Sequence, residues 1–132
     1  LHTERILVPI TSEEDFLTVR PMVCALAMVM DHSITVLWLM PADASASERA
    51  AGEDIVTQSM AQGLPGQVTV RAVATDSRVH EILAAAQEHD IVVMATGTQH
   101  GLRKMFFGSL AEDVALRLDK PMLMVRGGME SV

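Results

Sequence analysis

The stretch MATGTQHGLRKMFFGSLAEDV, in the last third of the chain, has the residue types of a loop that binds anions. It holds three glycines and the basic pair Arg103 and Lys104, and it enters a helix-like pattern through Gly108 and Ser109. Backbone N–H groups at a helix start have no partner within the helix and attract anions, and a glycine there leaves room for close approach. We therefore expect Gly108, Ser109 and Leu110 to face a phosphate-like group.

The charge pattern agrees with this interpretation. The chain of 132 residues has a formal net charge of −7, yet no acidic residue stands between Asp90 and Glu112. An acidic chain repels nucleic acid and anionic membrane surfaces, so we expect neither as a partner. The basic loop is a local reversal of sign, which favours a small anion.

Other chemistry has little support in the sequence. The dinucleotide pattern GxGxxG and the phosphate-loop pattern GxxxxGK[ST] are absent, and the five histidines are scattered without metal-ligand spacing. Ala111 stands where a nucleophile elbow around Ser109 would need a glycine. We assign no catalytic residue and no metal ligand, so ATP hydrolysis is the weakest functional hypothesis.

Nine elements must position this loop. Five apolar runs rich in Val, Ile and Leu predict buried strands at Arg5–Ile10, Ile34–Met40, Val68–Ala74, Ile91–Ala95 and Met122–Arg126. Helical spacing of apolar residues predicts helices at Glu13–Asp31, Ser47–Gln62, Val79–Glu88 and Leu110–Leu118. The alternation predicts an α/β fold, a three-layer sandwich with a parallel sheet between helices on both faces.

The helix starts also carry signals. Thr11 with Glu14, and Ser109 with Glu112, have the capping-box spacing, and Asp76 or Ser77 can cap the third helix. Pro21 predicts a kink or a late start for the first helix. In a parallel sheet, ligands bind beyond the carboxyl ends of the strands, which places the candidate site after the first and fourth strands.

The remaining composition sets the frame. The length suits one domain, residues 1–132, and half of the residues are apolar. The lone Cys24 cannot form an internal disulfide, and the longest apolar run is too short to span a bilayer. We expect a cytoplasmic protein. Because the chain begins with Leu1, we also expect that it can be a cytosolic domain cut from a longer protein.

Four segments together resemble the universal stress protein family. They are RILVPI, HSITVLWLMP, VHEILAAAQEHDIVVMATG and FFGSLAEDVALRLDKPMLMVR, and they cover most of the chain. The resemblance implies a five-stranded parallel sheet in the order 3-2-1-4-5, of the adenine-nucleotide-alpha-hydrolase-like type. It places Pro9 and Thr11 opposite the loop that leads to Ser109.

The chain departs from the motif of the nucleotide-binding members. That motif is G-x-x-G, nine residues, then G-[ST], and it places Ala95 and Thr98 where two glycines are expected. Gly97 and Gly101 lie nearby but out of phase, and Thr11 stands where the family has an aspartate. At Ala95 and Thr98 the added side chains take space next to the backbone that the glycines of the motif would leave free. Thr11 lacks the charged hydrogen-bond acceptor of an aspartate, and a bond to such an acceptor is worth roughly 1.5–3 kcal/mol.

The resemblance implies a regulatory or stress-response domain with weak or lost ATP binding that acts as a dimeric sensing module. The ligand can be ATP, ADP, AMP or a small anion such as phosphate, bound weakly. Two alternatives stay open: a regulatory or scaffold domain of a membrane transporter or sensor kinase, and a true ATP- or AMP-binding universal stress protein. An apolar edge strand at Pro121–Arg126 predicts a homodimer.

Overall fold

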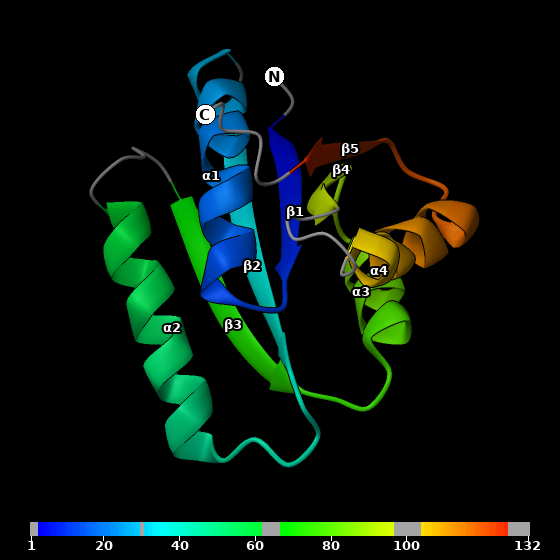
Figure 1. Cartoon of the computed structure of the whole chain (residues 1–132). Helices are drawn as coiled ribbons and strands as arrows, with labels where there is room; N and C mark the ends of the chain where they lie inside the picture. Colours follow the sequence, from blue (N-terminus) through cyan, green and yellow to red (C-terminus); the bar gives the residue numbers. More distant parts are fainter. Residues whose placement is uncertain (1–2, 30, 62–66, 97–103, 127–132) are drawn as a thin grey trace.

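The computed structural model describes residues 3–29, 31–61, 67–96 and 104–126 (Figure 1). Within these residues five strands and four helices alternate, as the sequence predicts. Their bounds are β1 Glu4–Ile10, α1 Glu13–Val29, β2 His32–Met40, α2 Ala46–Ala61, β3 Gln67–Ala74, α3 Arg78–Ala86, β4 Ile91–Thr96, α4 Lys104–Arg117 and β5 Met122–Arg126.

The strands form one parallel sheet in the order β3-β2-β1-β4-β5, which confirms the predicted fold class and strand order. The pairing is uneven. Strand β1 is in register with β2 at seven positions and with β4 at only two, Ile6 with Ile91 and Leu7 with Val92. Strand β1 is therefore paired with β2 along its whole length, whereas it separates from β4 after Leu7.

Each face of the sheet packs on two helices (Figure 1). Alternate residues of β1 point to opposite faces, because successive side chains of a strand alternate. Ile6, Val8 and Ile10 pack with α1 and α2, whereas Leu7 packs with α3 and α4. All four are at most 1% exposed, so β1 lies at the centre of both cores.

Helix α4 begins earlier than predicted. It starts at Lys104, so Gly108 and Ser109 lie inside the helix and the capping box of Ser109 with Glu112 is wrong. A glycine inside a helix costs about 1 kcal/mol, which does not stop a helix that also holds good helix formers such as Lys104, Met105 and Leu110. Within the helix a backbone N–H pairs with the carbonyl four residues earlier. Gly108, Ser109 and Leu110 therefore do not offer the free donors expected at a helix start.

Two other helix starts differ from the predictions. Helix α1 is capped by Ser12, whose Oγ accepts from the N–H of Asp15 at 3.1 Å, and not by the pair of Thr11 and Glu14. The helix continues through Pro21, which is exposed, so water can replace the missing backbone bond. Helix α3 has Ser77 at its cap position as expected, but that side chain makes no cap hydrogen bond.

Candidate functional site

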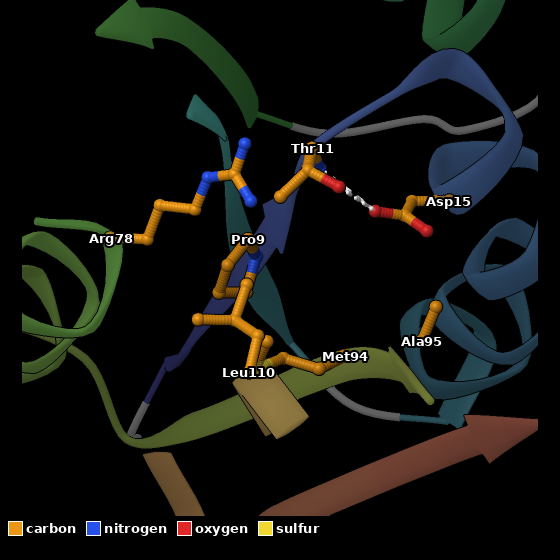
Figure 2. Close-up of a pocket in the computed structure, with 7 residues that line it drawn as sticks. All are labelled: Pro9, Thr11, Asp15, Arg78, Met94, Ala95 and Leu110. Atoms are coloured by element: carbon orange, nitrogen blue, oxygen red, sulfur yellow. Dashed lines mark hydrogen bonds between the residues drawn. The ribbon is translucent and has the colours of Figure 1, made fainter. Parts of the chain in front are cut away.

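A pocket lies where β1 and β4 separate. Their ladder ends at Leu7 and Val92, two residues before Pro9, and a proline has no N–H with which to continue a ladder. Beyond that point the carboxyl ends of the two strands line a cavity of about 260 Å³ (Figure 2). The cavity lies at the carboxyl ends of β1 and β4, where the strand order reverses. Parallel sheets typically bind their ligands at such a position.

Seven described residues line this pocket. They come from β1 and the turn after it, from α1, from the start of α3, from β4 and from α4: Pro9, Thr11, Asp15, Arg78, Met94, Ala95 and Leu110. Pro9, Met94, Ala95 and Leu110 make an apolar part, and Thr11, Asp15 and Arg78 make a polar part. The pocket can therefore hold an apolar or planar group next to polar ones.

The structure brings together four residues that the sequence predicts for the site, namely Pro9, Thr11, Ala95 and Leu110. Ala95 lies on the pocket wall, where a glycine would have left more room. Four other predicted residues lie outside the described residues: Gly97, Thr98, Gly101 and Arg103.

Asp15 is the main residue that the sequence reasoning missed. Its Oδ2 accepts two hydrogen bonds from Thr11, one from the backbone N–H at 2.9 Å and one from Oγ1 at 2.7 Å. The carboxylate thus lies beside the hydroxyl that stands where the family has an aspartate. Acidic residues are common in a first helical turn, where Asp15 stands beside Glu13 and Glu14, so the residue type alone carries no distinctive signal. The spacing of Ser12 and Asp15, three residues apart, indicates a helix cap but does not reveal that Asp15 lines the pocket.

Arg78 is the second residue that the sequence reasoning missed. It is the first residue of α3, its side chain is exposed, and it reaches over Pro9 toward Thr11 (Figure 2). Within the described part of the chain it forms no ion pair with Asp15 and no hydrogen bond with another side chain. The pocket therefore carries one positive and one negative group that do not neutralise each other.

The comparisons with known proteins agree with this geometry. The family model described as the universal stress protein family matches residues 2–126. The chain belongs to this family. No curated protein sequence matches it.

Solved structures of the family share the fold at low identity. UspA from Lactobacillus plantarum superposes with a TM-score of 0.75 at 15% identity, over 96% of this chain and 99% of its own. A universal stress protein in complex with cAMP gives 0.67 at 18% identity, over 95% and 98% of the two chains. The Archaeoglobus fulgidus protein in complex with dAMP gives 0.60 at 15% identity, over 94% and 98%. At these identities the likeness establishes the fold alone.

The described residues contain no cluster of three or more His, Cys, Asp or Glu side chains that could hold a metal ion. None of their helices combines the length and the apolar character needed to cross a bilayer.

Proposed function

We propose that this domain is a regulatory universal stress protein module that binds an adenine nucleotide with one phosphate, weakly, and binds ATP poorly. The observation that carries the proposal is the pocket between β1 and β4, with its apolar part and its two separate charges. Two proteins of the same fold are described in complex with cAMP and dAMP, which are nucleotides of this size.

The size of the pocket favours a small nucleotide over ATP. Sites for drug-sized ligands usually measure about 300–1,000 Å³, and this one, at about 260 Å³, is just below that range. The Cβ of Ala95 lies on its wall, where the nucleotide-binding motif has a glycine. Thr11 places a hydroxyl where the family resemblance implies an aspartate, although the carboxylate of Asp15 lies beside that hydroxyl.

Calorimetry with AMP, cAMP and ATP tests the proposal. We expect a dissociation constant for ATP above about 100 μM, which is less than about 5.5 kcal/mol of binding free energy. AMP or cAMP should bind more tightly than ATP. A low-micromolar ATP affinity would indicate that the segment with Gly97 and Gly101 forms a competent triphosphate site, and it would contradict the proposal. If no nucleotide binds, a scaffold that contacts a partner or a parent transporter or kinase chain becomes the better hypothesis.

We also propose that the module is a homodimer joined through β5. Of the two edge strands, β3 has the N–H of Ala72 occupied by the carboxylate of Glu53, at 2.8 Å. No comparable side-chain bond reaches the backbone of β5 within the described residues, and Met124 is 45% exposed. An uncovered apolar edge favours pairing with a second edge.

Sedimentation of the protein at micromolar concentration tests the dimer. Met124→Lys should shift the mass toward the monomer, because it places a charge on the pairing edge. Leu116→Lys is a matched control, since Leu116 is 83% exposed on α4 and is not part of the edge strand. A wild-type protein that sediments only as a monomer would contradict the proposal.

A further inference from the structure

The outer side of α1 is apolar, although it is exposed. The described residues hold seven exposed large hydrophobic side chains, and four of them are on this one helix: Leu17, Met22, Met28 and Val29. From Pro21 to Val29 the helix has no charged, hydroxyl or amide side chain on any side. A helix that is hydrophobic all round is normally buried. We therefore expect another molecule to cover this half of α1.

The exposed apolar residues of α1 have the spacing of a helix-pairing surface. They form two adjacent rows, one of Leu17, Pro21 and Met28 and one of Met22, Ala25 and Val29. The intervals within the rows are three, four or seven residues, which place side chains on one side of a helix and recur in paired helices. Phe16, Val19 and Val23 point into the core, so the two rows are left for a partner.

Helix α2 extends this apolar surface beside α1. A terminal nitrogen of Arg20 donates to the backbone carbonyl of Ser59 at 3.3 Å, so the two helices lie side by side (Figure 1). Ile55 is one helical turn before Ser59 and is 43% exposed. Residues one turn apart share a side of a helix, so Ile55 lies on the side of α2 next to α1. We call the exposed apolar residues of both helices the α1–α2 surface.

The exposed charges around the α1–α2 surface are all negative. The exposed charged residues of the two helices, and of the turn that follows α1, are Glu13, Glu14, Asp31, Glu48 and Asp54. The two cations of these helices, Arg20 and Arg49, are half-buried. Complementary charges steer a partner to a surface and exclude partners of the same sign. The surface therefore fits a partner that carries cations beside apolar side chains.

Two other occupants fit these charges less well. A second copy whose α1 packs antiparallel would bring its Asp31 toward Glu13 and Glu14, and a parallel arrangement would place two acidic first turns together. A bilayer surface attracts helices whose polar side is basic, whereas α1 and α2 expose acidic residues. A helix with basic ends meets neither repulsion.

We infer that the α1–α2 surface is the docking site for an amphipathic helix of another protein, with Lys or Arg residues at both ends of its apolar side. Amphipathic helices commonly bind by laying their apolar side on a hydrophobic surface. The apolar residues of the partner would lie along Leu17 and Met28, and its cations would lie near Glu13 and Asp31. Of the residues of α1 only Asp15 lines the pocket, so this contact is separate from ligand binding.

A titration with model peptides tests the inference. The probe is a helical peptide of about 14 residues, or four turns, built from leucine and lysine with the leucines on one side. In the comparison peptide, glutamate replaces each lysine. Both are titrated into the full chain at low ionic strength and followed by amide NMR shifts.

Two variants have matched controls on α4, away from the surface. Met28→Gln removes an apolar side chain that is 84% exposed, and Leu116→Gln does the same for one that is 83% exposed. Asp31→Asn removes an exposed acidic charge, and Glu112→Gln removes another.

We expect the lysine peptide to shift the amide signals of α1 from Leu17 to Val29 and to bind about tenfold more tightly than the glutamate peptide. Met28→Gln should weaken the binding about tenfold, or about 1.4 kcal/mol. Leu116→Gln should leave it unchanged. Asp31→Asn should weaken it about twofold, as exposed ion pairs do, and this difference should disappear in added sodium chloride. Glu112→Gln should have no such effect.

Each contrary outcome identifies the error. If the shifted amides lie outside α1 and α2, or if Met28→Gln binds the lysine peptide as tightly as the wild type, the surface is not a docking site. If both peptides bind equally, the basic partner is wrong. If the α1 signals instead shift on dilution of the protein alone, or on addition of phosphatidylcholine vesicles, a second copy or a bilayer covers the surface and the inference is wrong.

Discussion

Strand β1 pairs with its two neighbouring strands over very different lengths. Strand β2 stays in register with it for seven positions, from Glu4 with His32 to Ile10 with Trp38. Strand β4 stays in register for two positions and then separates. Strand β2 in turn pairs with β3 at eight positions, so we call β1, β2 and β3 the closed side of the sheet. We call β4 and β5 the open side, because the pocket lies where β4 separates from β1.

The difference does not come from the apolar content of the strands. Leu39 on the closed side is 0% exposed and Met94 on the open side is 3% exposed, so both sides are fully packed around the point of separation. What differs is the backbone: β1 reaches Pro9, which has no N–H, where a longer ladder with β4 would need donors. The closed side thus fixes the position of Thr11, and the open side leaves space in front of it.

The largest expected effect comes from truncating one buried side chain on each side. Substitution of a buried Leu or Met by Ala costs about 2–5 kcal/mol, and the cost rises with the cavity that remains. Leu39→Ala should lie near the upper end, since the sheet around it is closed. Met94→Ala should lie near the lower end, because the space it leaves joins the pocket and can fill with water. Urea unfolding midpoints of both variants measure this, and equal costs would contradict the comparison.

The next variant tests how closely α2 packs against β2. A Cβ at Gly52 would lie 2.6 Å from Cε of Met40 and 3.2 Å from a ring carbon of Trp38. Met40 can move its flexible end, but the Trp38 ring cannot easily do so, and overpacking of this kind costs about 1–3 kcal/mol. We expect Gly52→Val to destabilise by about 2 kcal/mol in thermal or urea unfolding.

Ala51→Val is the control for this variant. Ala51 is exposed on the same helix, so its substitution by Val should cost only about 0.5 kcal/mol through helix propensity. Gly52→Ala should be milder than Gly52→Val, because the gain in helix propensity, about 1 kcal/mol, offsets part of the contact. If Gly52→Val and Ala51→Val cost the same, α2 does not pack closely against β2.

The closed side is also the side that sequence reasoning predicts well. The runs that form β1, β2 and β3 are mostly apolar, and each observed strand lies within two residues of its predicted bounds. Strand order and the edge position of β5 follow from the family resemblance and are confirmed. The strand bounds, in contrast, depend on local hydrophobic patterns, which a single sequence displays directly.

The open side was predicted less well, for physical reasons. Helix α4 starts at Lys104, four residues before Gly108, and a capping pattern at Ser109 could not reveal that earlier start. The roles of Asp15 and Arg78 depend on the convergence of α1 and α3 at one pocket, which no local spacing encodes. Pro9, Thr11 and Ala95 were found because they directly follow or end predicted strands.

A smaller effect should follow from removing the hydroxyl of Thr11. Thr11→Val keeps the shape but loses the 2.7 Å bond to Asp15, while the backbone bond from residue 11 remains. Hydrogen bonds of this kind contribute about 1 kcal/mol when partly exposed. We expect a loss of about that size in urea unfolding. Thr18→Val is the control and should be nearly neutral, because Thr18 only bonds back to the carbonyl of Glu14 in its own helix.

The smallest effect concerns a contact between β1 and the residue before β4, at the end of this junction away from the pocket. Asp90 lies just before β4, and its carboxylate accepts the backbone N–H of Arg5 at 2.8 Å and side-chain bonds from Nε and a terminal nitrogen, both at 3.2 Å. The Asp90 N–H in turn donates to the Arg5 carbonyl at 2.7 Å. These bonds hold β1 and β4 together at the end away from the pocket.

The hydrogen bond to Asp90 and its charge raise the pKa of the Arg5 guanidinium above its ordinary value. A raised pKa of a cation contributes stability that is present at lower pH and is lost only as the pH rises through that pKa. Because arginine stays protonated up to about pH 12, this contribution is constant across neutral and mildly alkaline pH. The pair is exposed to solvent, so salt screens it.

Asp90→Asn should therefore lower the melting temperature slightly. The loss should be smaller than for the four variants Leu39→Ala, Met94→Ala, Gly52→Val and Thr11→Val. The difference from wild type should shrink as sodium chloride is added and should stay the same between about pH 7 and pH 10, because Arg5 does not titrate there. Arg5→Gln should have a similar effect, and the double variant should show that the two losses are not additive. If the difference in melting temperature is independent of salt and the losses of the two single variants add, the charge pair of Arg5 and Asp90 does not stabilise the junction of β1 and β4. The end of the junction away from the pocket would then be no more stable than the end at the pocket.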